Sequence, residues 1–320
     1  MVILNLSHNN YHSLLKKISA QLKTKITNNA IELPKHIGKG TIKVIQLPNG
    51  LQALMAKINF AQEVLVKSGN TNEGDYILNF DETESKAPKA AASKTIVTSF
   101  VRLTGESFKH WEVFKKGYSL QYVKILFSKA WLSNYIGLSK KMSLFEKYIP
   151  VKSEAGEKEK LNDDYKRIIT EMWHAGENIF MQNIFYHNRI LLLIEQFFTR
   201  AHATMQNPKG KFKLTADEVL RLKKIEKKLN IFSKIPPTPE HLAITSGLDA
   251  ARLTQIFKQV YGTSIFNYYQ QQRMKKGYEL LEKKDLSIKE VSNKLGYTNV
   301  SNFNVAFTRQ FAVSPQSLLE

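Results

Sequence analysis

Two segments near the end of the chain match each other, and this repeat constrains the fold more than any other feature. The first, HLAITSGLDAARLTQIFKQVYGTSI, spans residues 241–265, and the second, EVSNKLGYTNVSNFNVAFTRQFAVSP, spans residues 290–315. In each, a short apolar stretch, a glycine and a longer stretch with helical apolar spacing follow one another. The pattern predicts two helix-turn-helix units, because the glycine allows a tight turn and the first helix supports the second. The matched positions are Gly247 with Gly296, Phe257 with Phe307, Tyr261 with Phe311, and Ser264 with Ser314.

The helical spacing divides each unit into a buried and an exposed side. The predicted core comprises Leu242, Leu248, Leu253, Ile256, Phe257 and Val260 in the first unit, and Val291, Leu295, Phe303, Ala306, Phe307 and Phe311 in the second. The exposed faces carry short, polar or basic side chains and no acid, which suits hydrogen bonds to base edges and phosphates. We expect the following residues to contact double-stranded DNA: Ala251, Arg252, Thr254, Gln255 and Lys258, and Asn299, Ser301, Asn302, Asn304 and Thr308.

Residues 236–320, from PPTPEHLAITSGL to the closing FAVSPQSLLE, resemble the DNA-binding domain of the AraC/XylS family of transcription regulators. The resemblance implies two recognition helices, joined by one long helix, that enter successive major grooves of a promoter operator. It also implies three further partners: a small-molecule effector, RNA polymerase and a second copy of the chain.

The resemblance assigns roles within the exposed faces. Ala251, Thr254, Gln255, Ser301 and Asn304 would face bases, and Arg252, Lys258, Asn302 and Thr308 would lie nearer the DNA backbone. Ala251 and Val305 depart from the family, whose members often carry larger polar or basic groups at these outward positions. These two residues leave methyl contacts to thymine in place of hydrogen bonds.

The first half of the chain reads as strands. Period-two alternation predicts strands at 41–47, 51–58, 75–80, 94–101 and 119–127, and Pro48-Asn49-Gly50 predicts a hairpin turn between the first two. Ser128 is a candidate N-cap for a helix that begins near Lys129. We expect residues 1–150 to form a β-rich regulatory domain, either a small sandwich or a cupin-like barrel, which more weakly resembles the variable domain of the same family.

A helical region follows. Residues 151–164 are charged and lack an apolar period, so they predict an exposed connection, although Asp163-Asp164 suits the start of a helix. Apolar spacing from 165 to 205 predicts two helices that break near Gly176. We expect residues 160–230 to be a helical linker that pairs subunits, and residues 231–320 to be the all-helical DNA-binding domain. The fold class is therefore α+β.

Composition limits the protein's surroundings and partners. The net charge is +19, and residues 209–320 hold 19 Lys and Arg against 10 Asp and Glu, which favours a polyanionic partner. The chain has no cysteine and no apolar run of membrane-spanning length, and its first residues do not read as a signal peptide. We expect a cytoplasmic protein that has no membrane partner.

Two other classes of protein remain as alternatives. One is a cupin-like enzyme, with or without a metal ion, fused to a DNA-binding module; it would need clustered histidines, whereas residues 41–127 contain only His110. The other is an architectural protein that binds DNA with little sequence preference. The phosphate-loop, dinucleotide and hydrolase-elbow motifs are absent from the sequence. We expect no catalytic residue, no cofactor and no metal ion.

Overall fold

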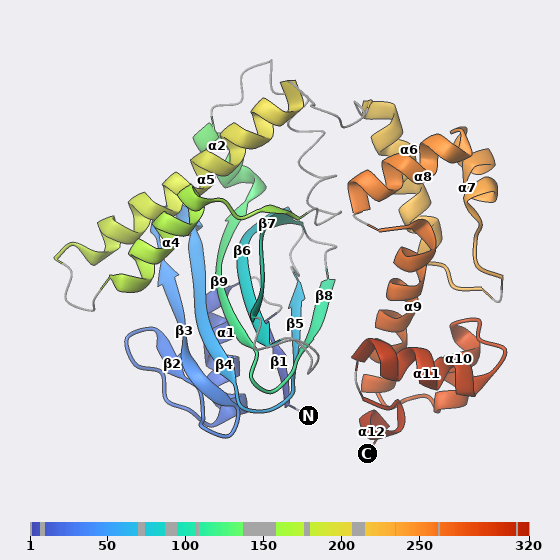
Figure 1. Ribbon diagram of the computed structural model, residues 1–320, viewed down its shortest axis with the longest axis horizontal. Coiled ribbons are helices and arrows are strands. Elements are labelled where there is room, and N and C mark those ends of the chain that lie inside the picture. Colours follow the sequence, from blue (N-terminus) through green and yellow to red (C-terminus); the bar gives the residue numbers. More distant parts are fainter. Residues whose placement is uncertain are drawn as a thin grey trace. The chain divides into compact units, whose positions relative to one another are not determined.

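The computed structural model folds into two compact units, residues 1–209 and 210–320 (Figure 1). The residues that the structure describes are 2–6, 10–69, 74–86, 95–105, 109–136, 158–175, 180–206, 215–233, 235–261, 263–311 and 313–319.

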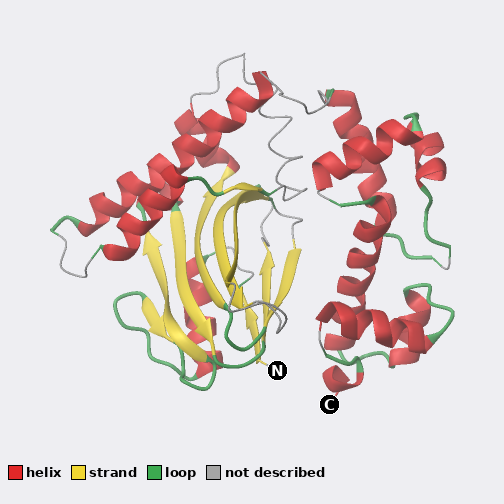
Figure 2. Ribbon diagram, viewed as in Figure 1, coloured by secondary structure: helices red, strands yellow, loops and turns green. Residues whose placement is uncertain are grey.

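The first unit is built on two β-sheets (Figure 2). The larger has the strand order β10 (Glu159–Lys160), β7 (Thr95–Thr104), β6 (Asp75–Lys86), β9 (Ser119–Ser128), β4 (Gln52–Phe60), β3 (Gly38–Gln46), β2 (Ala30–Glu32), and its neighbouring strands are antiparallel. The smaller has the order β1 (Val2–Asn5), β5 (Val64–Gly69), β8 (Lys109–Phe114), in which β1 is parallel to β5.

The larger sheet is buried on both faces, because its alternating side chains enter two separate cores. One set, which includes Met55, Phe80 and Val123, packs against helices α2 (Lys129–Ile136), α4 (Asp163–His174) and α5 (Gln182–Gln206). The opposite set, which includes Leu54 and Tyr122, packs against the smaller sheet and α1 (Tyr11–Leu22). Residues on the second face of β6, β7 and β9 thus lie between two sheets instead of facing water.

Several predictions for this unit are confirmed. Each of the five expected strands lies in β3, β4, β6, β7 or β9 with shifted ends. The turn at Pro48–Gly50 joins β3 to β4, with Asn49 and Gly50 at positive φ as tight turns require. The Ser128 hydroxyl accepts a hydrogen bond from the Trp131 amide at 3.0 Å, as an N-cap does. Asp163 and Asp164 lie in the first turn of α4.

Other features of this unit differ from the sequence-based expectation. The expected connection at 151–164 is wrong for Glu159–Lys160, which pairs with β7 as β10, while residues 151–157 and the expected break at Gly176 fall outside the described residues. The sequence pattern also did not reveal α1 or the strands β1, β2, β5 and β8. These strands are short, or they lack clear alternation.

The second unit is helical. Its elements are α6 (Ala216–Leu229), α7 (Pro239–Ser246), α8 (Ala250–Tyr261), α9 (Ile265–Glu282), α10 (Ile288–Lys294), α11 (Val300–Phe311) and α12 (Gln316–Leu319). The region 160–230, expected as one linker, is divided between the units: α4 and α5 pack on the β-sheet core, whereas α6 packs with α7 and α9. No helix among the described residues is long and apolar enough to cross a membrane.

Candidate nucleic-acid interface

The two repeated segments form turns with matching hydrogen bonds. Between α7 and α8, the Leu248 amide donates to the Ala243 carbonyl at 3.2 Å, and Gly247 has a φ of 66°. Between α10 and α11, the Tyr297 amide donates to the Ser292 carbonyl at 3.0 Å, and Gly296 has a φ of 77°. Glycine at both positions is explained by this left-handed conformation, which costs other residues free energy. The predicted helix-turn-helix repeat is confirmed in its geometry.

The longer helix of each helix-turn-helix motif, α8 or α11, begins with a side chain that caps its first turn. The Asp249 Oδ1 atom accepts a hydrogen bond from the Arg252 amide at 2.9 Å, and the Asn299 Oδ1 atom accepts one from the Ser301 amide at 2.7 Å. These side chains satisfy amides that a helix leaves without partners at its first turn. Asn299, predicted as a DNA contact, therefore also holds the start of α11.

Helix α9 packs against both helix-turn-helix motifs of the second unit through two tyrosines. Tyr268 meets the rings of Phe257 and Tyr261 at centroid distances of 5.5 and 5.0 Å. Ten residues later, Tyr278 meets the equivalent rings of Phe307 and Phe311 at 5.8 and 5.0 Å. The repeat therefore extends to packing, and α9 acts as a common support for α8 and α11.

Arg273 fixes the second helix-turn-helix to α9. Its side chain is 4% exposed, and its Nε atom donates to the carbonyl of Leu295, the residue that ends α10, at 2.6 Å. Its guanidinium lies 3.8 Å from the ring centroid of Tyr297. One turn further, α9 carries Gly277, where a Cβ atom would come within 2.8 Å of the Leu295 side chain and 3.2 Å of the Phe303 ring.

Helix α6 braces the first helix-turn-helix. Its Glu226 accepts hydrogen bonds from the hydroxyls of Tyr268, at 2.6 Å, and Tyr261, at 3.2 Å. Its Arg221 donates to the carbonyls of Ser246 and Gly247, at 2.7 and 2.9 Å. These two carbonyls lie at the C-terminal end of α7. This helix is therefore structurally part of the second unit.

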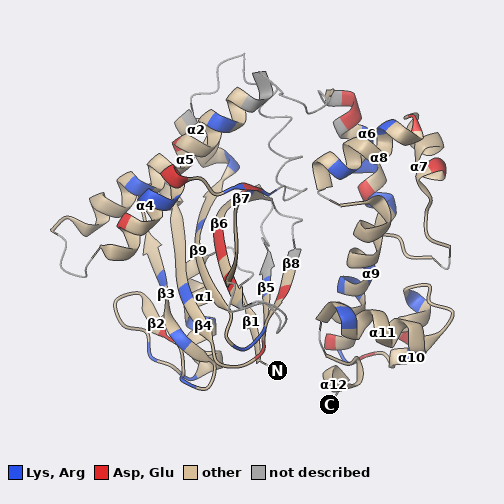
Figure 3. Ribbon diagram, viewed as in Figure 1, with Lys and Arg blue, Asp and Glu red and all other residues tan. Residues whose placement is uncertain are grey.

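The predicted core is largely confirmed, since all its members are buried except Leu248 and Ala306, which are half-buried. Of the residues predicted to contact DNA, Arg252 and Asn304 are half-buried and the other eight are exposed. Neither α8 nor α11 contains an Asp or Glu residue (Figure 3). The exposed set on α8 and α11 thus presents two acid-free faces, and Val305 adds an apolar side chain that is 69% exposed.

Arg252 and Asn304 differ from the rest in their surroundings. The Nε atom of Arg252 donates to Oε1 of Glu218 on α6 at 2.7 Å. This bond is the largest cause that lowers the pKa of the Glu218 carboxyl and raises that of Arg252. The Oδ1 atom of Asn304 is buried and has no hydrogen-bond partner in the described part of the chain. The sequence pattern predicted that both side chains face solvent. In the structure, Arg252 instead contacts a carboxylate and the Oδ1 atom of Asn304 is buried.

Sequence reasoning did not identify Arg273, Glu218 or Glu226. A signal for Arg273 exists, because it falls in a four-residue spacing with Tyr269, Gly277 and Leu281 on the buried side of α9. A charged residue at such a position needs a partner. The Glu218–Arg252 and Glu226–tyrosine contacts offer no comparable signal, because the residues they join lie far apart in the sequence.

Comparison with known proteins agrees with this geometry. Residues 242–320 match a family model described as a helix-turn-helix domain. The HTH-type transcriptional regulator AlkR of Acinetobacter baylyi is 31% identical over 134 residues, which cover 42% of each protein. Residues 242–320 are an AraC-type helix-turn-helix domain. The Msm operon regulatory protein of Streptococcus mutans is 40% identical over 68 residues, 21% of this chain and 24% of that protein.

A solved structure of an AraC-type regulator from Chromobacterium violaceum is 21% identical and covers 33% of this chain and 94% of that one, with a TM-score of 0.30. The present chain spans less than half the length of the curated relatives it matches.

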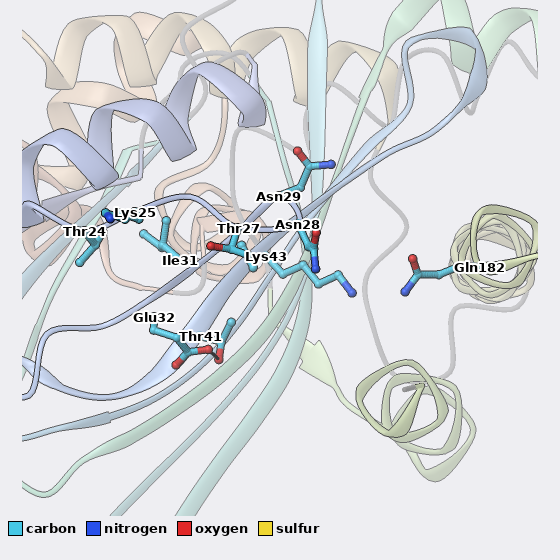
Figure 4. A pocket seen from close by; sticks show the side chains of 11 residues that line it. Thr24, Lys25, Thr27, Asn28, Asn29, Ile31, Glu32, Thr41, Lys43 and Gln182 are labelled. Atoms are coloured by element: carbon cyan, nitrogen blue, oxygen red, sulfur yellow. Dashed lines mark hydrogen bonds between the residues drawn. The ribbon is translucent and has the colours of Figure 1, made fainter. Parts of the chain in front are cut away.

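The first unit has a polar pocket of about 960 Å³ between the turn that precedes β2 and the start of α5 (Figure 4). Gln182 of α5 points toward Lys43 of β3 across its opening. The Lys43 Nζ atom lies 3.3 Å from the Tyr186 hydroxyl. The lining is polar and open to solvent, so it differs from the mostly apolar walls of typical small-molecule sites. Within the described residues, no group of three His, Asp or Glu side chains is placed to hold a metal ion.

Proposed function

We propose that the protein is a DNA-binding transcription regulator whose α8 and α11 enter successive major grooves of an operator. The observation that carries this proposal is the pair of matching turns, which present two exposed, acid-free helix faces on one supporting helix. A helix of this kind fits the major groove, and acid-free polar faces avoid repulsion from phosphates. The names of the relatives, which are transcriptional regulators, agree with this role.

Individual contacts follow from the exposed faces. Ala251, Thr254, Gln255, Ser301 and Asn304 are proposed to face bases, and Arg252, Lys258, Asn302 and Thr308 to lie nearer phosphates. Asn299 is proposed as a further DNA contact. Because the Nε atom of Arg252 donates to Glu218, this ion pair restrains the guanidinium and offsets part of its attraction to phosphates. The first unit is proposed to bind a small-molecule effector. A second copy of the chain, RNA polymerase and a cytoplasmic location complete the proposal.

Selection of binding sites from random duplexes by the full chain tests the proposal, followed by affinity measurements at one fixed salt concentration. Specific binding should exceed binding to unrelated duplex by about 10³ or more. A ratio near one would favour the architectural alternative, which the small Ala251 and the apolar Val305 support.

Base reading is tested by single substitutions. Gln255→Ala should weaken binding to the selected operator by about 1–3 kcal/mol, because one base contact is lost. It should weaken binding much less when the operator is changed at the base pair that Gln255 reads, because that contact is already missing. Gln271→Ala, an exposed glutamine of α9, is the matched control and should leave both affinities unchanged. An equal loss on every sequence would show that Gln255 does not read bases.

A further inference from the structure

One position of the repeat carries a glutamine in the first helix-turn-helix motif and a valine in the second. Helices α8 and α11 both contain 12 residues, and their sixth residues are Gln255 and Val305. Two residues further on, Phe257 and Phe307 are fully buried, and their rings contact tyrosines of α9 at centroid distances of 5.5 and 5.8 Å. Because two residues of a helix span a rotation of about 200°, Gln255 and Val305 project from the side opposite this contact. The two side chains therefore occupy equivalent positions on the exposed faces.

Val305 is an apolar side chain on an otherwise polar face. It is 69% exposed, and it is the only exposed large apolar side chain of α8 and α11, two helices that the structure describes throughout. Its exposed neighbours on α11 include Ser301, Asn302 and Thr308, which are polar and uncharged. Single exposed apolar residues are common on protein surfaces, so exposure alone does not indicate a function. The position of Val305 does, because it lies within the face that is proposed to enter the major groove.

The major groove offers a valine side chain one apolar group, the 5-methyl group of thymine. The other groups on the base edges there are hydrogen-bond donors and acceptors. Valine cannot bond to them, so covering them would remove their water without a replacement. Residues 300–308 also contain no Lys or Arg, the side chains that most often select guanine. This part of α11 therefore favours a thymine methyl group over the polar edge of a G·C pair.

We propose that Val305 reads the 5-methyl group of a thymine, at the position where Gln255 of the first motif reads hydrogen-bonding groups. The inference rests on the proposed function, because it names a base that the operator must contain. Gln255 is able to bond to N6 and N7 of an adenine. The two motifs thus share one fold but distinguish bases by different physical means, and the two halves of the operator should differ at this position.

Deoxyuridine in place of single thymines of the selected operator tests the proposal, because it removes only the 5-methyl group. One such replacement should weaken binding of the full chain about fourfold, the effect expected for the burial of one apolar carbon. Val305→Ala should bind the unmodified operator less tightly and should lose this response. Unchanged affinity for every replaced thymine, or an equal loss in the wild type and Val305→Ala, would overturn the proposal.

A C·G pair at the same position separates the methyl group from the base pair that carries it. The wild type should bind this operator more weakly, and 5-methylcytosine should recover about fourfold in affinity. Val305→Ala should show no such recovery. Thr308→Ser is the matched control, because it removes one methyl group from a neighbouring exposed side chain of α11 and keeps the hydroxyl. It should keep the full response to deoxyuridine, and loss of that response would overturn the assignment to Val305.

The reciprocal substitution tests whether the two positions are equivalent. In a new selection from random duplexes, Gln255→Val should acquire a thymine at the base pair that Gln255 reads, and deoxyuridine there should weaken binding about fourfold. Val305→Gln should lose the response to deoxyuridine in the other half of the operator. A Gln255→Val protein without any methyl response would overturn the equivalence from which the inference is drawn.

The outcomes separate this inference from the proposed function. Val305→Ala should not lower the midpoint of thermal unfolding, because Val305 is exposed, so its effect on DNA is measured in a folded protein. Sequence-specific binding without a Val305-dependent response to deoxyuridine would reject the inference and leave the regulator proposal intact. Wild-type operator affinity in Val305→Ala would also reject it and would assign Val305 to a protein contact. The absence of any sequence-specific binding would reject the regulator proposal, and base reading by Val305 with it.

Discussion

Replacing Arg273 by Met tests whether a single buried side chain holds the second helix-turn-helix on α9. Methionine keeps much of the apolar stem but removes the charge and the donors. The variant loses the 2.6 Å hydrogen bond to the Leu295 carbonyl, and hydrogen bonds of charged groups contribute about 1.5–3 kcal/mol. It also loses the contact at 3.8 Å with the Tyr297 ring, for which about 0.5–2 kcal/mol is typical.

Together these terms predict that Arg273→Met lowers the free energy of unfolding of the second unit by about 2–5 kcal/mol. Domains of ordinary size are stable by about 5–15 kcal/mol, so the loss should be large enough to loosen α10 and α11. Arg273→Lys should cost less, because it keeps a charge but loses the planar stacking and the fixed donor geometry.

Urea unfolding followed by two signals measures this loss. Far-ultraviolet circular dichroism reports the helices of both units, whereas tryptophan fluorescence reports only the first unit. Arg273→Met should shift the dichroism transition and leave the fluorescence transition in place. Arg309→Met, at an exposed arginine of α11, is the control and should change stability by less than about 0.5 kcal/mol. An Arg273→Met protein as stable as this control would refute the reasoning.

Four other substitutions test separate parts of the structure. Phe307→Ala should destabilise the second unit by about 3–5 kcal/mol, and retained cooperative melting at the wild-type midpoint would contradict its place in the core. Gly277→Ala should cost about 1 kcal/mol in the same assay, because crowding against Leu295 outweighs the gain in helix propensity; increased stability would show that the side chain yields easily. Glu218→Gln keeps the capping group but releases Arg252, so DNA affinity should rise severalfold at low salt and the salt dependence should steepen; unchanged binding would show that the ion pair does not restrain Arg252. Burial lowers the pKa of Lys124 to about 8 in the folded protein, against about 10.5 in the unfolded chain, so the unfolded chain binds more protons between these pH values. From pH 7 to pH 10 the free energy of unfolding of the wild type should therefore rise by about 2–3 kcal/mol relative to that of Lys124→Met. Urea unfolding at both pH values measures this difference, and parallel curves for the two proteins would contradict the burial of Lys124.

The sequence predicted the second unit well because the information there is local. Each turn is specified by a glycine, each longer helix by an N-cap side chain at its start, and each core by helical spacing. The repeat supplied an independent check, since the same positions recur 49 or 50 residues later. The repeat does not contain the partners that α6 and α9 provide, such as Glu218 of α6 for Arg252 and Arg273 of α9 for the Leu295 carbonyl.

The sheet shows the opposite limit of sequence patterns. Period-two alternation located β6, β7 and β9. It cannot say what covers the other face. Asp81, Arg102 and Lys124 occupy the positions that face water in a one-sided sheet, but β5 and β8, which come from short runs without clear alternation, cover them.

Buried charged residues occur in both units, but their surroundings differ. Arg273 is buried with a carbonyl and an aromatic ring that it holds in place, so its charge contributes to the fold directly. Between the two sheets of the first unit, the Tyr122 hydroxyl and one Asp81 oxygen are buried without a hydrogen-bond partner among the described residues, and burial lowers the pKa of Lys124, so burial of these groups is costly. Burial of Arg273 therefore stabilises the second unit, whereas burial of the Lys124 ammonium opposes the stability of the first.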